Sequence, residues 1–350
     1  MKVYGILTYV ATLGEIANAL ISFPGAEGFG RNAIGGRNGS VYVVTNVNDT
    51  ETGSLRDAVP QTDRTVVFAV GGVINITDRI VASKRVTIPG QTAPGGGITT
   101  YGNGWSLSDA DDIGRDETFS INGDVCNVTI QNSIIARGLE THSCGGLMQT
   151  DGGVSLFRNF YIDNKTRNPK VKGVNDFTNN VIYNWGGGGG YIAGDSDVQS
   201  YANIAGNYFI SGPLTTVTAF TRGNDNLHRY VENNYYDDNQ DGTINGKELG
   251  VTSSNYGGMV IMSSRYDYPA PVRQLTPAEA VTYATSYVGA SKVRDSIDTR
   301  LISELTTWGT TGELISDETA SPMYGPGTID GGSSSVGSDG QGGQQSVAVN

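Results

Sequence analysis

Asparagine followed by apolar and aromatic residues recurs along the middle of the chain. The segments begin at Asn132, Asn159, Asn180, Asn207 and Asn234. They read NSIIA, NFYID, NVIYN, NYFIS and NYYDD, at spacings of 27, 21, 27 and 27 residues. Short β-rich segments at such an interval are typical of a solenoid, in which parallel strands stack coil on coil. We expect the asparagines to form a ladder of hydrogen bonds that satisfies buried turn amides.

The flanking segments predict a strand-rich beginning and a helical end. VYVVTNVND, TVVFAVGGVINI and RVTIPG, which precede the repeat, have the β-branched composition of strands. After the repeat, helical spacing over about residues 276–306 follows two start signals, Thr276-Pro277 and Asp295. We therefore expect C-terminal helices packed on an all-β solenoid. Residues 331–350 are rich in Gly and Ser and predict a flexible tail.

The first residues have the pattern of a cleaved secretory signal. Lys2 precedes an apolar run that ends at Leu13, and Ala17-Asn18-Ala19 forms a small-x-small cleavage site. We assign residues 1–19 to the signal and 20–330 to the folded domain. No later run has the length of a membrane span. Five glycosylation sequons agree with a secreted, extracellular protein: Asn38, Asn48, Asn75, Asn127 and Asn164.

Composition narrows the classes of protein that remain. The 350 residues are 37% hydrophobic, enough for a substantial core, and 50 glycines without a G-x-y period exclude collagen. The formal net charge of -12 opposes binding to nucleic acid. Cys126 and Cys144 could form one disulfide or stay free.

A basic cluster stands out in this acidic chain. Five cations face one Asp163 between positions 158 and 172: Arg158, Lys165, Arg167, Lys170 and Lys172. A local field of that sign attracts an anion. The alternative is a solvated basic strand edge that prevents aggregation. Pro169 stiffens the segment and would hold the cations on a fixed framework.

Residues 237–248, DDNQDGTINGKE, match the template of a calcium-binding loop. The side-chain ligands would be Asp237, Asn239, Asp241 and Glu248, and Thr243 would offer its backbone carbonyl. Asn245 could act through water. Because a strand precedes this loop, we expect a structural Ca²⁺ without the EF-hand helix pair. The alternative is an acidic solvated turn.

Several longer stretches resemble one known family. They are FPGAEGFGRNAIGGRNGSVYVVTNVNDTETGSLRDAV, GQTAPGGGIT, GRDETFSI, RNPKVKG and NNVIYNW. Together they resemble the secreted pectate lyases of polysaccharide lyase family 1, especially the fungal pectate lyase C type, from about Phe23 to Glu318. The resemblance implies a right-handed parallel β-helix, the same architecture that the repeat predicts. It also implies calcium-dependent cleavage of polygalacturonate, the pectin backbone of plant cell walls, by β-elimination.

The resemblance also implies roles for individual residues. The family's R-x-P-x-x-R pattern falls on Arg167, Pro169 and Lys172, with lysine in place of the second arginine. Arg167 would take the C5 proton, and Lys172 and Lys170 would bind substrate carboxylates. Asp116 falls in the family's calcium-ligand region. His142 is the polar side chain closest to the place of a substrate-binding lysine, although a satisfied turn histidine is an equal reading.

The chain departs from the family upstream of this region. One or two coils that relatives carry between YGNGWSLSDADD and IGRDETFSI are absent, including an aspartate that binds the catalytic calcium. We therefore expect weaker activity than that of a longer relative. The alternatives are a non-catalytic pectin-binding β-helix protein and a polygalacturonase-type hydrolase, which would need two carboxylates across the bond. Capped solenoids are commonly monomers, and we expect a monomer here.

Overall fold

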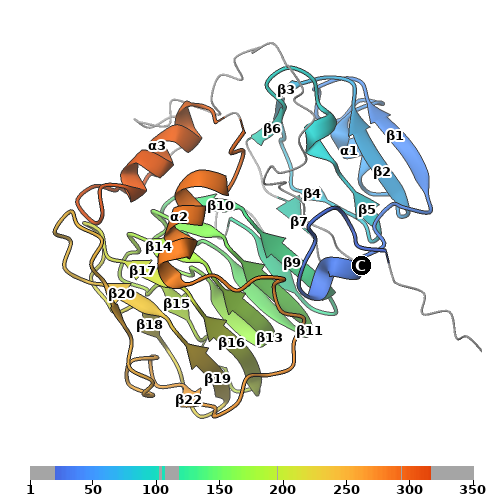
Figure 1. Ribbon diagram of the computed structural model, residues 1–350. Coiled ribbons are helices and arrows are strands. Elements are labelled where there is room, and N and C mark those ends of the chain that lie inside the picture. Colours follow the sequence, from blue (N-terminus) through green and yellow to red (C-terminus); the bar gives the residue numbers. More distant parts are fainter. Residues whose placement is uncertain (1–19, 102–104, 107–117, 195, 293, 317–350) are drawn as a thin grey trace, which may run out of the picture.

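The computed structural model describes residues 20–101, 105–106, 118–194, 196–292 and 294–316, and its main body is a stack of parallel strands (Figure 1). One sheet contains, in spatial order, β18 (Phe220–Thr221), β15 (Tyr191–Ile192), β13 (Lys170–Thr178), β16 (Ser200–Ala205), β19 (Leu227–Glu232) and β22 (Val260–Ile261). The long strand β11 (Leu147–Phe157) pairs with β13 and also with β8 (Ser120–Asn122) and β9 (Cys126–Gln131).

A second sheet forms another wall of the same stack. Its order is β10 (Ile134–Ala136), β12 (Phe160–Ile162), β14 (Val181–Tyr183), β17 (Tyr208–Ile210), β20 (Tyr235–Asp237) and β21 (Lys247–Glu248). Every pairing among β8 to β22 is parallel except that of β20 with β21. This is a parallel β-helix, so the predicted fold class is confirmed.

The asparagine ladder exists, but it begins one coil later than predicted. The side-chain oxygens of Asn180, Asn207 and Asn234 each accept the backbone N–H of the preceding asparagine, at 2.9, 2.8 and 3.2 Å. In the first coil Ile134 lies opposite Phe160, which places Ser133 in register with Asn159. The assignment of Asn132 to the ladder was therefore wrong.

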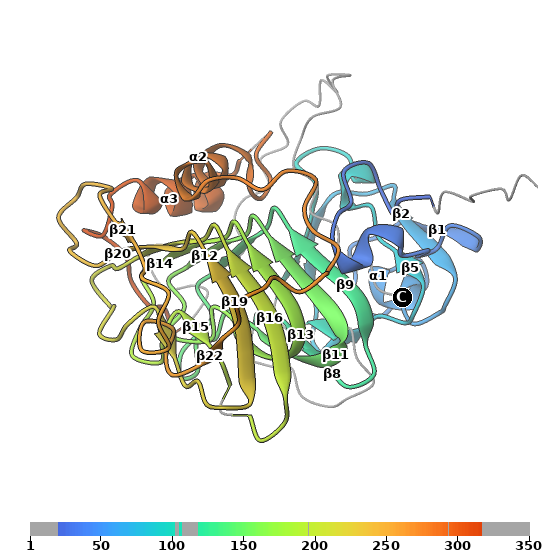
Figure 2. The ribbon, with the colours of Figure 1, turned by 60° about the horizontal axis from the view of Figure 1, so that its bottom comes forward.

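Successive side chains of the second sheet point to opposite faces and pack in two different hydrophobic cores. Tyr161, Ile182 and Phe209 point into the interior of the solenoid. Their neighbours point outward and pack under two helices, α2 (Pro277–Tyr287) and α3 (Ser296–Leu305), which cover this wall (Figure 2). The C-terminal helices were predicted correctly.

Each of these two helices begins at the N-cap residue that the sequence predicts, Thr276 for α2 and Asp295 for α3. The hydroxyl of Thr276 accepts the N–H of Glu279, and the carboxylate of Glu279 accepts the N–H of Thr276, which forms a capping box. The carboxylate of Asp295 accepts the N–H of Asp298. Both caps satisfy backbone donors at a helix start.

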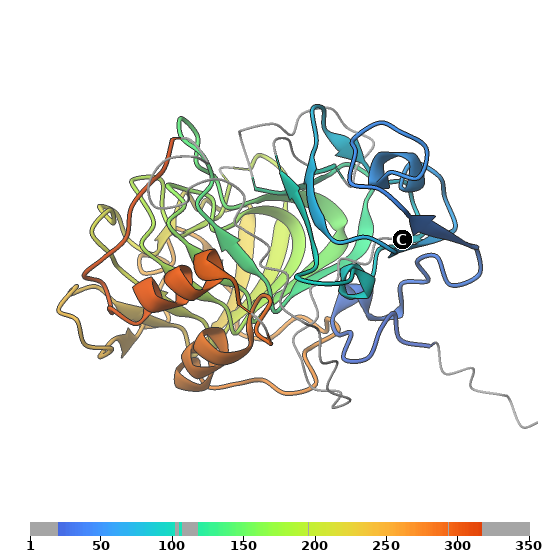
Figure 3. The same ribbon diagram turned by 90° about the horizontal axis from the view of Figure 1, so that it is seen from above.

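The N-terminal coils form a separate group of strands at one end of the stack (Figure 3). They are β1 (Ser40–Val44), β2 (Arg64–Phe68), β3 (Gly72–Asn75), β4 (Ile80–Val81), β5 (Val86–Thr87), β6 (Ile98–Tyr101) and β7 (Trp105–Ser106), with α1 (Leu55–Ala58) and the 3-10 helices η1 (Phe29–Asn32) and η2 (Gly90–Thr92). Among the described residues these strands pair only with one another, in parallel. Their core is a distinct aliphatic cluster around Val66 and Ile74.

A short N-terminal segment bridges the two groups by packing on β9. Gly30 N–H donates to the hydroxyl of Thr129 at 2.9 Å, and that hydroxyl donates to the carbonyl of Glu27 at 2.8 Å. A Cβ at Gly30 would lie 2.8 Å from the backbone nitrogen of Thr129, so only glycine allows this approach. The Glu27 carboxylate also pairs with Arg158 at 2.6 Å.

Some sequence predictions concern residues outside the described ranges, and the structure decides others. The predicted signal, Asp116 and the predicted tail lie outside the described residues. Cys126 and Cys144 do not form a disulfide with each other. No helix in the described part of the chain is long and apolar enough to cross a membrane.

Candidate functional site

Arg167, in the middle of the basic cluster, lies in a turn that is hydrogen-bonded to the coil before it and to the coil after it. The carbonyl of Arg167 accepts the N–H of Gly146 at 2.8 Å, and the N–H of Asn168 donates to the carbonyl of Gly190 at 2.9 Å. Arg167 has a φ of 57°, in the left-handed region. Its side chain is half-buried. The backbone at Arg167 is thus fixed by the coil before it and the coil after it.

Lys170 and Lys172 follow on β13 and share its outer face. Both are half-buried, whereas Val171 between them is fully buried in the interior. Period-two alternation places the two ammonium groups on the outside of the solenoid. A Cβ at Gly194, one coil later, would lie 2.9 Å from Cγ of Lys172, so the glycine leaves room for the lysine stem.

Two polar side chains that the sequence analysis missed lie in register with Lys172. Gln149 of β11 is its partner, and Asn122 of β8 is the partner of Gln149. Strands in register share their faces, so the three side chains form an outward row across three coils. Their spacings of 27 and 23 residues match the coil interval and were the available signal.

Arg222 is a second residue that the sequence analysis passed over. It follows β18, whose Thr221 pairs with Ile192, and Ile192 pairs with Lys170. The Arg222 side chain is exposed. It therefore lies next to the row of Lys170, two coils further along.

Not all five cations belong to this site. Arg158 is buried, pairs with Glu27 and donates from Nε to the side-chain oxygen of Asn132 at 3.0 Å. Lys165 pairs with Glu140 at 3.4 Å. The predicted single cluster is therefore corrected: Arg158 joins the N-terminal segment to the stack, and the anion-attracting part is reduced to Arg167, Lys170 and Lys172.

His142 lies one coil before Arg167. Its side chain is exposed, in the turn that leads to the buried Cys144. Cys144 forms a parallel bridge with Thr166, so the His142 turn and the Arg167 turn are neighbours. This position is compatible with contact to a substrate that lies along the Arg167 turn.

The predicted calcium loop is closed by its own hydrogen bonds. Asn245 N–H donates to Asp237 Oδ2 at 2.9 Å, and Asn245 Nδ2 donates to Asp241 Oδ2 at 2.9 Å. Asn239 Nδ2 donates to Asn245 Oδ1 at 2.8 Å. Three of the predicted ligands, Asp237, Asn239 and Asp241, thus contact backbone or side-chain groups of Asn245.

The remaining predicted ligands do not complete a metal site. Thr243 donates its N–H to Asp241, and Glu248 is exposed in β21, opposite Tyr235. Among the described residues, no three acidic, histidine or cysteine side chains are grouped so that they could hold a metal ion. Hydrogen bonds within the loop use Oδ2 of Asp237 and both carboxylate oxygens of Asp241. Calcium binding at this loop stays a prediction.

The basic face offers few calcium ligands among the described residues. Asp151 is exposed at the irregularity of β11 where the pairing register to β13 shifts, and its Oδ1 lies 3.0 Å from the place of a Cβ on Gly173. One carboxylate cannot supply the six to eight oxygens of a calcium site. The described residues of this face therefore do not form a calcium site by themselves.

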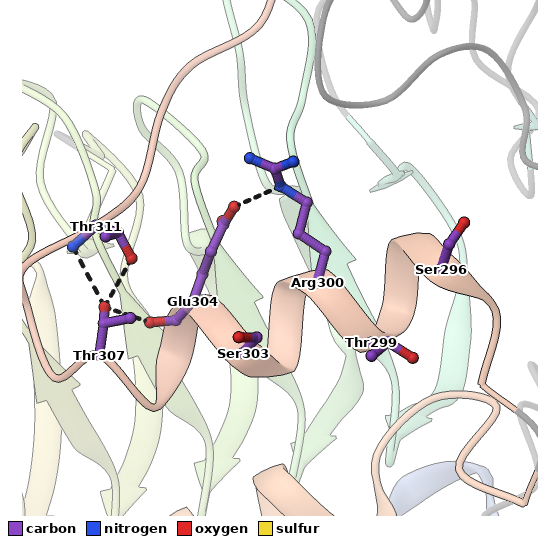
Figure 4. Close-up of a pocket in the computed structure, with 7 residues that line it drawn as sticks. All are labelled: Ser296, Thr299, Arg300, Ser303, Glu304, Thr307 and Thr311. Atoms are coloured by element: carbon purple, nitrogen blue, oxygen red, sulfur yellow. Dashed lines mark hydrogen bonds and ion pairs between the residues drawn. The ribbon is translucent and has the colours of Figure 1, made fainter.

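A shallow hollow runs along α3 on the opposite, helix-covered wall (Figure 4). Its charged lining residues are Arg300 and Glu304, which pair with each other at 2.8 Å. Glu304 also accepts two hydrogen bonds from the buried Arg137, at 2.6 and 2.7 Å. The charges of this hollow are balanced internally, so it is a poorer place for a polyanion than the β13 cations.

Asp163 lies beneath that hollow and is fully buried. Burial raises the pKa of Asp163 above its usual range, and its Oδ1 accepts from Asn184 Nδ2 at 2.6 Å. Burial also opposes ionisation of Glu304, but the hydrogen bonds from Arg137 outweigh it and lower the Glu304 pKa. The two shifts favour the neutral form of Asp163 and the charged form of Glu304, and Arg137 Nε lies 3.3 Å from Asp163 Oδ2.

The sequons differ in accessibility. Asn38, Asn48 and Asn75 are exposed, and Asn127 is half-buried. Asn164 is 1% exposed, and its Nδ2 donates to Ile135 O and Asn168 Oδ1. A glycan has no room on that nitrogen in the folded protein, so the prediction of glycosylation at Asn164 is corrected.

Comparison with known proteins relates the chain to pectate lyases. A probable pectate lyase C from Aspergillus fumigatus is 66% identical over 374 residues, which cover 96% of this chain and 89% of the relative. One from Aspergillus oryzae is 61% identical over 379 residues, 98% of this chain and 90% of the relative. No protein-family model matches.

A solved structure also aligns, with less overlap. Pectate lyase II from Xanthomonas campestris pv. campestris is 16% identical, covers 77% of this chain and 99% of its own, and has a TM-score of 0.45. This overlap adds nothing to the assignment, which rests on the two sequence relatives.

The alignment with the Aspergillus fumigatus relative is longer than the part of this chain that it covers. It spans 374 positions, whereas 96% of 350 residues is 336, so about 38 positions of the relative have no counterpart here. That difference has the size of one or two coils at the observed spacing. The chain belongs to the fungal pectate lyase C family.

Proposed function

We propose that this protein is a secreted pectate lyase that cleaves polygalacturonate by β-elimination, with Arg167 as the base. The observation that carries the proposal is the fixed turn at Arg167 beside two outward lysines on β13. Polygalacturonate bears one carboxylate per sugar, and an ordered row of cations suits such a polymer. The family membership supplies the reaction class.

The chemistry assigns a separate task to each cation. Lys170 and Lys172 bind uronate carboxylates and hold the sugar ring against the turn. Like charges nearby disfavour the protonated form of a guanidinium, so the two lysines favour a neutral Arg167 that can act as a base. Arg167 accepts the C5 proton, the C4–C5 double bond forms, and the C4–O bond breaks. The released oxygen then takes up a proton.

Calcium would act on the substrate carboxylate beside the C5 proton. When bound, calcium would neutralise a substrate carboxylate and make the C5 proton more acidic. The described residues of this face do not hold the ion alone, so Asp116 would have to contribute. We propose a residual calcium requirement and lower activity than in longer relatives.

Product analysis distinguishes this proposal from its alternatives. Elimination produces an unsaturated uronide that absorbs at about 235 nm. Hydrolysis produces reducing ends without that band, and a binding protein leaves the polymer intact. We expect a rise in absorbance on polygalacturonate that a chelator suppresses. Reducing ends without the band, or no cleavage by a folded protein, would contradict the proposal.

A hydrolase is further disfavoured by the position of one candidate acid. A glycoside hydrolase needs two accessible carboxyls across the bond. Asp237 is 3% exposed and accepts from Asn245, so it cannot act on a polymer together with Asp238. The other acidic doublet, Asp111-Asp112, lies outside the described residues.

Secretion is proposed from the sequence together with the family. The expected mature protein begins at Leu20 and carries glycans on Asn38, Asn48 or Asn75, which are exposed. We expect a monomer. Amino-terminal sequencing and the intact mass of protein from the culture medium of a fungal host test this expectation, and an uncleaved amino terminus would contradict it.

A further inference from the structure

A buried arginine lies inside the solenoid without a counter-ion. Arg229 of β19 is 0% exposed. It faces the interior, in register with Ala202 of β16 and, beyond that, with Asn175 of β13. Asn175 and Ala202 are fully buried as well. The three side chains therefore form one inward row across three coils, with the small alanine at its centre.

The hydrogen bonds of Arg229 leave its charge uncompensated. Its terminal nitrogens donate to the carbonyls of Ser200 and His228, at 2.8 and 3.0 Å, and to the hydroxyl of Ser200 at 2.9 Å. All these partners are neutral. Within the described residues no carboxylate pairs with Arg229, and its Nε has no hydrogen-bond partner. Burying a lone charge in this way is strongly unfavourable.

Two further donors in the same interior also lack partners. They are Asn175 Nδ2 and the hydroxyl of Tyr161, and both residues are 0% exposed. The hydroxyl of Tyr191 joins the group, because it donates to Asn175 Oδ1 at 3.2 Å. We call Arg229, Asn175, Tyr161 and Tyr191 the interior polar cluster. The groups of this cluster that lack a hydrogen-bond partner are all donors.

The tyrosines cannot supply the missing negative charge. Burial raises the pKa of Tyr161 and of Tyr191, so both hydroxyls stay neutral at the pH where the protein is folded. Asp176 is next to Asn175 in sequence, but alternation along β13 points it to the other face, where it pairs with Arg265 at 3.2 Å. The cluster therefore carries a net positive charge that nothing around it balances.

We propose that the interior polar cluster binds one small monovalent anion, of the size of chloride or bromide, enclosed over Ala202. Such an ion compensates Arg229 and accepts hydrogen bonds from its Nε, from Asn175 Nδ2 and from Tyr161. A water molecule would accept only two of these bonds, would bring two hydrogens of its own, and would leave the charge unbalanced.

The anion would act as a structural ligand of the stack. Its contacts come from β13 and β19 and from β12 on the facing wall, so it can bind only when these coils have assembled. A ligand that binds the folded state alone raises stability by mass action. Once the chloride concentration exceeds the dissociation constant, each tenfold increase raises the folding equilibrium constant about tenfold.

Equilibrium unfolding at constant ionic strength tests the proposal. Sodium chloride or bromide replaces sodium gluconate, whose anion is too large to enter. We expect the logarithm of the folding constant to rise with the logarithm of halide concentration at a slope near one. Arg229→Met, which keeps the length of the side chain without its charge, should lose this slope. Arg273→Met removes an exposed cation and should keep it.

A second measurement does not depend on a variant that folds. Crystals of the wild-type protein grown in bromide should show an anomalous scattering peak beside Nε of Arg229. An ordered water there, together with a halide slope of zero in the wild type, would overturn the proposal. If Arg229→Met fails to fold, the wild-type slope and the bromide peak decide the question.

Discussion

The N-terminal coils and the main stack share one architecture but are stabilised in different ways. In the main stack, Asn180, Asn207 and Asn234 are fully buried and pass hydrogen bonds from coil to coil. In the N-terminal coils, ion pairs nearer the surface join neighbouring segments, such as Arg85 with Asp63 at 2.5 Å. Surface pairs contribute little to stability, whereas a buried amide is costly to leave unpaired.

The two regions also differ in their cores. Aromatic rings fill the main stack, where Trp185, Phe209 and Phe220 are buried together. The N-terminal core is made mostly of valine and isoleucine. Because each coil of a solenoid contacts only its neighbours, a chain that lacks coils can keep both groups folded. The comparison leads us to expect that the weakest contacts of the stack lie at the junction between the two groups.

The largest expected effect is on the ladder of the main stack. Asn207→Leu removes the acceptor of two donors of Asn180, at 2.8 and 3.1 Å, and the donor to Phe177 O and Asn234 Oδ1. Buried groups left unpaired cost about 1–3 kcal/mol each, so we expect a loss of about 3 kcal/mol in the free energy of unfolding. Denaturant titration measures it.

The matched control for the ladder lies in the N-terminal coils. Asn75→Leu changes an exposed asparagine of β3 and should alter the free energy of unfolding by less than about 0.5 kcal/mol. Equal losses in the two variants would show that the ladder does not distinguish the two regions.

We expect a smaller loss in the free energy of unfolding from a change at the junction between the N-terminal coils and the main stack. Glu27→Ala leaves the buried Arg158 without its carboxylate and should cost about 2 kcal/mol, because the pair is only partly exposed. We expect the loss to appear as opening of the N-terminal coils. Limited proteolysis should then cut within residues 20–101 well before the main stack. Cleavage of both regions at one rate would argue against a weak junction.

The smallest effect is a pH dependence of the main stack. Burial raises the pKa of Asp163, so its neutral form is favoured in the folded state. The stability this provides is complete below the ordinary aspartate pKa of about 3.9 and is lost as pH rises towards the folded value. Asp163→Asn stays neutral, so its melting temperature should fall less than that of the wild type as pH rises above about 4. Parallel melting curves would contradict this assignment.

The sequence predicted those features whose causes are local or periodic. The helix starts at Thr276 and Asp295 followed from caps that act within three residues. The ladder followed from a coil-sized interval, but pairing in the first coil favours Ser133 over Asn132, and only the strand register reveals this. The calcium-loop template is also local, but the structure shows two of its carboxylates hydrogen-bonded to Asn245, so calcium binding there stays a prediction.

Other features depend on partners that lie far apart in the chain. The pairing of Arg158 with Glu27 joins residues that are 131 positions apart, and that of Arg137 with Glu304 spans 167. Nothing near either arginine in the sequence indicates these carboxylates. The candidate site residues Arg167, Lys170 and Lys172 could be proposed because a proline motif and a charge anomaly coincide in one segment.

The most direct test of the account is the initial rate of absorbance increase at about 235 nm on polygalacturonate with calcium, for wild type, Arg167→Ala and Lys165→Ala. Loss of a catalytic base lowers rates by about 10²–10⁴-fold, so Arg167→Ala should be nearly inactive with an unchanged melting temperature. Lys165 pairs with Glu140 outside the site, and its variant should stay within about twofold of the wild type. An Arg167→Ala protein as active as the wild type would contradict the central claim.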